Sequence, residues 1–101
     1  MEYIPDRWIL IKIITPENEV LYKVLAGWFG GYLGSDSWKI NSGITSVEEN
    51  DNSYEYTGYT GSVYVCRKSS YGTTMLSLSI LGSLGDRVSV VPESEVQGLK
   101  F

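Results

Sequence analysis

The chain of 101 residues contains no histidine and only one cysteine, Cys66. Without an imidazole there can be no Ser-His-Asp triad and no Cys-His dyad, and most zinc sites lose a preferred ligand. A lone cysteine forms no internal disulfide, which fits a reducing cytoplasm. The sequence also lacks the GxxxxGK[ST] pattern of a phosphate-binding loop. We therefore expect a cytoplasmic protein that is not an enzyme and that uses neither a metal ion nor a cofactor.

Basic residues and long apolar runs are also scarce. Eight lysines and arginines stand against twelve acidic residues, which gives a net charge of −4. Binding to nucleic acid depends on clustered basic residues that neutralise phosphates, so we expect no nucleic-acid partner. The first apolar run, Trp8 to Ile11, ends at Lys12. A membrane span needs about 20 apolar residues, and the N-terminus shows no secretory signal, so we expect no membrane partner.

Most of the chain shows the alternation of apolar and polar residues that is typical of β-strands. In the first such segment Ile9, Ile11 and Ile13 share one face, which predicts a buried isoleucine face. Thr15-Pro16-Glu17-Asn18 is a typical turn sequence, so the next segment is expected to pair antiparallel with the first. The strands predicted in this way are 7–14, 20–26, 37–40, 44–49, 53–59, 62–68 and 87–91.

The segment 74–84 has a different pattern. Leu76, Ile80 and Leu84 follow the i, i+4, i+8 spacing of a helix, and Thr73-Thr74 can cap its start. Leu76, Leu78 and Ile80 also fit the alternation of a strand, which leaves an all-β barrel as the alternative. The fold predicted is α+β, a twisted antiparallel sheet or partial barrel of about five to seven strands with one C-terminal helix. We expect a single globular domain over residues 1–92 and a polar C-terminal tail over 93–101.

Glycines and aromatic residues are concentrated between positions 26 and 43, where five glycines and four aromatics occupy eighteen positions. Glycine permits unusual backbone conformations and close approach, and aromatic rings offer large flat surfaces. Further tyrosines follow in the segment 53–59. These rings could form core, a ligand cleft with polar groups at its edge, or a subunit interface. The candidate binding residues are Trp28, Tyr32, Asp36, Trp38, Asn41, Tyr54, Tyr56 and Tyr59.

Three functions fit this pattern. The leading one is a small non-catalytic binding or interaction module whose aromatic, glycine-rich surface contacts a small molecule or a protein. The second is a homo-oligomeric structural accessory protein, and the third is an enzyme based on carboxylate or tyrosine chemistry. Strands such as 7–14 carry large side chains on both faces. A single helix cannot cover both faces of the predicted sheet. Because large apolar patches usually mark interfaces, we expect a homodimer.

The run Gly-Trp-Phe-Gly-Gly-Tyr-Leu-Gly-Ser-Asp-Ser-Trp-Lys-Ile-Asn-Ser-Gly-Ile, positions 27 to 44, resembles a segment of small uncharacterised bacterial proteins of mobile gene pools, of the integron gene-cassette type. The similarity extends from the N-terminus to about Tyr71. It implies a cytoplasmic accessory protein. Because that group has no assigned activity, the resemblance implies no site residues.

Overall fold

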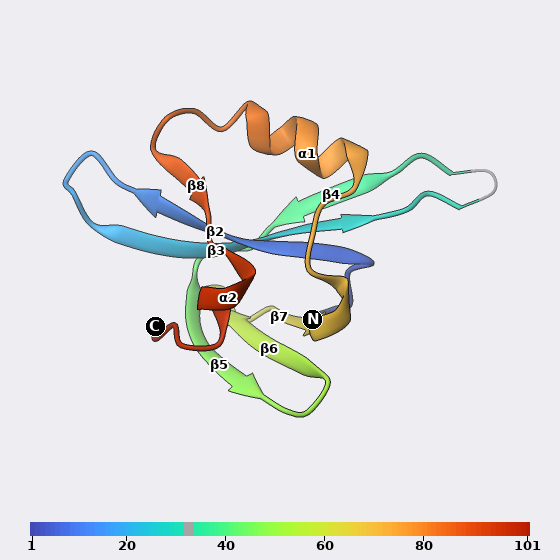
Figure 1. Ribbon diagram of the computed structural model, residues 1–101, viewed down its shortest axis with the longest axis horizontal. Helices are drawn as coiled ribbons and strands as arrows, with labels where there is room; N and C mark the ends of the chain where they lie inside the picture. Colours follow the sequence, from blue (N-terminus) through green and yellow to red (C-terminus); the bar gives the residue numbers. More distant parts are fainter. Residues whose placement is uncertain (32–33) are drawn as a thin grey trace.

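The computed structural model describes residues 1–31 and 34–101, and these residues form two four-stranded sheets and two α-helices (Figure 1). One sheet has the strand order β1-β7-β6-β5, and the other has the order β4-β3-β2-β8. The elements are β1 (Glu2–Tyr3), β2 (Arg7–Ile14), β3 (Val20–Trp28), β4 (Ser37–Ile40), β5 (Ile44–Glu49), β6 (Ser53–Gly58), β7 (Val63–Arg67), the 3-10 turn η1 (Lys68–Ser70), α1 (Met75–Gly82), β8 (Val88–Val90) and α2 (Glu93–Val96).

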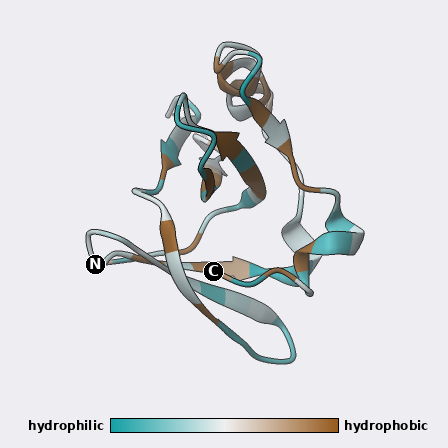
Figure 2. Ribbon diagram, turned by 90° about the vertical axis from the view of Figure 1, so that its left-hand side faces the viewer, coloured by the Kyte–Doolittle hydropathy of each residue, from teal (hydrophilic) through white to brown (hydrophobic). Residues whose placement is uncertain are grey.

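The α+β prediction is confirmed. Neighbouring strands run antiparallel in both sheets except for β1 and β7, which are parallel. Figures 1 and 2 show α1 on one side of the β4-β3-β2-β8 sheet and the other sheet on its opposite side. Among the described residues the strands form two open sheets and no closed barrel, so the all-β barrel alternative is wrong. The described residues contain eight strands in two sheets, where we expected one sheet of about five to seven strands.

Strand β2 lies in the middle layer and is buried on both faces. Trp8 and Leu10 belong to the core cluster between the two sheets. Ile9 and Ile11 belong to a second cluster, beneath α1. All four side chains are at most 2% exposed, so the predicted isoleucine face is core, and the opposite face is core as well. The β1-β7-β6-β5 sheet therefore covers part of the apolar surface of β2 that led us to predict a dimer.

Helix α1 begins where the sequence predicted it. The Thr74 hydroxyl accepts a hydrogen bond from the Ser77 backbone N–H at 3.1 Å, and the Ser77 hydroxyl accepts one from the Thr74 N–H at 2.8 Å. This reciprocal capping box satisfies two backbone donors at the helix start. The cap packs on Gly27 of β3, where an added Cβ would lie 2.9 Å from the Thr74 side chain. Glycine at this position therefore lets α1 approach the sheet.

The segment 93–101 packs against the sheets and is not a free tail. Its first residues form α2, and Val96 is only 5% exposed in the core between the sheets. Leu99 packs against the same core, and the ring of Phe101 lies 5.5 Å from that of Tyr22. This segment has few apolar residues, but the spacing of Val96, Leu99 and Phe101 lets each contact residues of the core between the sheets. The segment 93–101, which we expected to be a polar tail after Pro92, therefore packs together with residues 1–92.

No helix in the described part of the chain is both long enough and apolar enough to cross a membrane.

Candidate functional site

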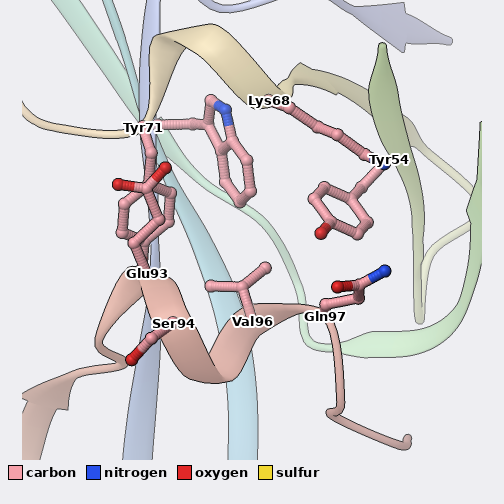
Figure 3. Close-up of a pocket in the computed structure, with 8 residues that line it drawn as sticks. Tyr54, Lys68, Tyr71, Glu93, Ser94, Val96 and Gln97 are labelled. Carbon is pink, nitrogen blue, oxygen red and sulfur yellow. The ribbon is translucent and has the colours of Figure 1, made fainter. Parts of the chain in front are cut away.

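The structure places a cavity of about 240 Å³ where α2 lies beside β6 and the end of η1. Figure 3 shows Lys68 extending above Tyr54, and Val96 pointing into the cavity from α2. We call this cavity the α2 pocket. Its lining residues are Trp8, Tyr54, Lys68, Tyr71, Glu93, Ser94, Val96 and Gln97.

Three aromatic rings form the floor of the α2 pocket, and backbone hydrogen bonds hold two of them. The Trp8 indole N–H donates to the carbonyl of Arg67 at 2.7 Å. The Tyr71 hydroxyl donates to the Val91 carbonyl at 2.5 Å and accepts from the Leu10 N–H at 3.1 Å. The Trp8 ring lies 4.7 Å from Tyr71 and 5.9 Å from Tyr54, edge to face in both pairs. The floor is therefore rigid, and the polar tips of Trp8 and Tyr71 are already satisfied.

Charged groups surround the rim of the α2 pocket. The Lys68 ammonium lies 2.5 Å from a carboxylate oxygen of Glu49, and the Gln97 side chain donates to the same oxygen at 3.3 Å. Hydrogen bonding to Glu49 is the main reason that the pKa of Lys68 is raised. The same ammonium lies 5.1 Å from the centre of the Tyr54 ring, a cation–π contact. Burial, with a further contribution from Glu93, raises the pKa of Tyr71 despite the opposing effect of its Leu10 hydrogen bond.

A second cavity of about 220 Å³ lies on the other side of the C-terminal segment. It contains one aromatic ring, that of Tyr22, and is otherwise lined by residues of strands, loops and α2. The C-terminal segment therefore separates two hollows, and only the α2 pocket has an aromatic floor. Its lining residues are Lys12, Tyr22, Ser89, Val90, Val91, Pro92, Glu95 and Leu99.

Of the eight predicted binding residues, Tyr54 lines the α2 pocket and Tyr56 lies next to it. The two rings stack 5.8 Å apart at an angle of 25°. Tyr56 is 1% exposed, and within the described part of the chain its buried hydroxyl has no hydrogen-bond partner. Burial is the main cause that raises the pKa of Tyr56. Tyr56 is therefore a core residue behind the pocket.

The residues predicted from the glycine-aromatic segment do not join Tyr54 in one cleft. The Trp28 indole donates to the Ile4 carbonyl at 2.9 Å, and an Asp36 oxygen accepts from the Gly30 N–H at 2.9 Å. Asn41 is buried and accepts from the Val24 N–H at 2.9 Å. These three residues stabilise the protein's own backbone.

The remaining predicted residues are exposed or undescribed. Trp38 is 43% exposed on β4, and Tyr59 is 81% exposed at the turn between β6 and β7. Tyr32 lies outside the described residues. The predicted cleft of stacked rings around the glycine-aromatic segment is therefore not formed by the residues that the structure describes.

Sequence reasoning missed most of the α2 pocket. Trp8 was assigned only to a strand face, and Glu93 and Gln97 were assigned to the polar tail. One signal could have helped: Val96, Leu99 and Phe101 are apolar residues spaced closely enough for a packed segment. The position of Tyr71 carried no such signal, because its hydrogen bond joins residues 61 positions apart.

Neither a cluster of metal-ligating side chains nor an accessible thiol is found among the residues that the structure describes. Within residues 1–31 and 34–101, no group of three or more metal-ligating side chains is close enough together to hold an ion. Burial raises the pKa of the Cys66 thiol, and this side chain is fully buried, so it makes a poor nucleophile. Comparison of the chain with protein-family models, with curated proteins and with solved structures finds no match.

Proposed function

We propose that this protein is a small non-catalytic binding module and that its ligand occupies the α2 pocket. The observation that carries the proposal is the floor of three aromatic rings, two of which, Trp8 and Tyr71, are held in position by hydrogen bonds to the backbone. Binding sites for small molecules are typically concave and mostly apolar, with a few polar groups that fix orientation. Glu93 and Gln97 supply such groups at the rim.

The size of the α2 pocket favours a small ligand or a single side chain of a partner. Its volume of about 240 Å³ lies below the roughly 300–1,000 Å³ that is typical of pockets for drug-sized ligands. A cytoplasmic accessory protein, as the resemblance of residues 27–44 implies, fits this role. The buried Cys66 is consistent with a reducing compartment.

Tryptophan fluorescence offers a direct test, because Trp8 lines the pocket and only Trp28 and Trp38 must be removed to isolate its signal. The Trp28→Phe/Trp38→Phe variant is titrated with small cations, acids, alcohols and neutral aromatics. We expect a saturable change in Trp8 emission with at least one class. A Val96→Phe substitution fills the pocket from α2 and should abolish that change. If the Trp8 emission changes only linearly, without saturation, with the concentration of every probe class, the proposal is contradicted.

A homodimer is a second proposal, and the outer face of α1 favours it. Met75 and Leu78 are 87% and 57% exposed. Trp38 lies on the same side of the sheet, because it pairs with Gly27, which faces α1. The segment 69–85 contains no charged residue, and Figure 2 accordingly draws α1 in hydrophobic or neutral colours. A second copy would cover this apolar surface.

Light scattering tests the dimer. We expect a mass of twice 11.3 kDa for the wild-type chain and 11.3 kDa for a Leu78→Glu variant. A Tyr59→Glu variant is the control, because Tyr59 is even more exposed than Leu78 but lies away from α1, at the turn between β6 and β7. A wild-type chain that is monomeric at about 0.1 mM, a concentration at which a dimer with a Kd near 1 μM is almost fully formed, would contradict the proposal.

A further inference from the structure

We propose that the α2 pocket binds an organic ammonium ion, such as a quaternary ammonium group, and that the Lys68 side chain occupies this position when no ligand is bound. This inference rests on the proposed binding function and names its ligand class. It is drawn from the rings, the charges and the placement of Lys68.

The aromatic walls have the chemistry of a cation site. The face of an aromatic ring carries partial negative charge, and ammonium groups are attracted to it within about 6 Å of the ring centre. Tyr54 presents its ring to the Lys68 ammonium at 5.1 Å, and Trp8 and Tyr71 stand beside it. Tyr54 is held in place by stacking on Tyr56 at 5.8 Å. A cation at this position therefore meets a preformed surface.

The charges around the α2 pocket also favour a cation. Its lining includes one ammonium, that of Lys68, and one carboxylate, that of Glu93. Glu49 adds a second carboxylate, which is paired with Lys68. Two negative charges against one positive charge leave an excess of negative charge. An anionic ligand would meet a lysine that Glu49 already neutralises, together with repulsion from Glu93.

Lys68 itself shows that an ammonium group fits here. Its Nζ contacts both the Tyr54 ring and the Glu49 carboxylate, which are the two partners that an external cation needs. The side chain is about one third exposed and joins the short η1 turn, so it can leave into solvent without disturbing a strand. A ligand would take its place, and Glu49 would then pair with the ligand.

The experiment compares two probes of nearly equal shape in the Trp28→Phe/Trp38→Phe background. Choline carries a trimethylammonium group, and 3,3-dimethylbutan-1-ol is its uncharged carbon analogue. We expect choline to bind about tenfold more tightly, judged by saturation of the Trp8 emission change. Equal binding of the two probes would overturn the ammonium inference and leave a simple apolar pocket, so the proposed binding function would stand.

Matched variants test the role of each charge. Lys68→Met removes the internal competitor and should strengthen choline binding by about threefold or more, whereas Lys39→Met should not. Lys39 is the appropriate control because its ammonium lies 5.3 Å from the Tyr3 ring, in a separate cation–π pair. Glu93→Gln should weaken choline binding by about threefold or more, whereas Glu95→Gln, on the other side of α2, should have no effect.

The failures of the two proposals can be told apart. If choline does not bind even to the Lys68→Met variant, while another probe class saturates the Trp8 signal, the ammonium inference is wrong and the binding module remains. If no probe class of any charge saturates the signal, both are wrong. Stronger choline binding by Lys68→Met together with weaker binding by Glu93→Gln supports the inference.

Discussion

Tyr56 and Tyr71 both contact the Trp8 ring, but their hydroxyl groups have different surroundings. The Tyr71 hydroxyl makes two hydrogen bonds to backbone groups of Leu10 and Val91. The Tyr56 hydroxyl is buried, and the described residues offer it no partner. An unpaired buried polar group costs about 1–3 kcal/mol, whereas a made hydrogen bond contributes about 0.5–1.5 kcal/mol. The same chemical change should therefore have opposite effects at the two positions.

We predict that Tyr56→Phe raises the free energy of unfolding by about 1 kcal/mol, because it removes an unpaired hydroxyl and keeps the ring. Tyr71→Phe should lower the free energy of unfolding by about 1–3 kcal/mol, because it leaves backbone groups of Leu10 and Val91 unpaired. Urea unfolding of the two variants measures both changes. A loss of stability at Tyr56 as large as that at Tyr71 would show that the Tyr56 hydroxyl has a partner in solution.

At the level of secondary structure, the contact between α1 and β3 depends on a glycine. A Cβ at Gly27 would lie 2.9 Å from the Thr74 side chain, which caps α1. At Gly82, the last residue of α1, an added Cβ meets nothing within 4 Å. Alanine substitutions at Gly27 and Gly82 therefore distinguish two effects. The first measures crowding at the contact between α1 and β3, and the second measures the low helix propensity of glycine.

We predict that Gly27→Ala lowers the free energy of unfolding by about 1–3 kcal/mol, because α1 or its cap must shift. Gly82→Ala should raise it by about 0.5–1 kcal/mol, because alanine favours the helix and has room there. Thermal or urea unfolding followed by circular dichroism checks both. Equal and small effects at the two positions would mean that α1 does not pack closely on Gly27.

The elements differ in how far the sequence could predict them. The β2–β3 hairpin and the start of α1 depend on local signals, namely alternation, the Pro16 turn and the Thr74 cap, and these predictions are confirmed. The division of the strands between two sheets depends on contacts between distant segments, which no local pattern encodes. The α2 pocket was missed for the same reason, because it joins β2, β6, η1 and the C-terminal segment.

At the level of the whole molecule, buried tyrosines link stability to alkaline pH. Burial, the largest cause, raises the pKa of Tyr64 from 10.0 to about 12, and burial also raises the pKa of Tyr56 and of the Cys66 thiol. Between these two pH values the folded chain keeps a proton at Tyr64 that the unfolded chain releases. The contribution of Tyr64 to stability is therefore fully present below about pH 10 and is lost as the pH rises toward 12.

We predict that the urea midpoint falls steadily between about pH 10 and 12 and that Tyr64→Phe makes this fall less steep. Unfolding curves at several pH values, with tyrosinate absorbance as a second probe, give the measurement. A midpoint that stays constant or rises over this range would contradict the assignment of Tyr64 as a buried, neutral phenol.

If the ligand binds in the α2 pocket, as proposed above, amide chemical shifts of the pocket residues will report it. The ¹⁵N-labelled wild-type chain is titrated with the probe classes used for fluorescence. We expect saturable shift changes to cluster at Lys68, Tyr71, Glu93 and Gln97. Changes that cluster instead around Trp28 and residues 34–38, or the absence of any saturable change, would contradict the proposal.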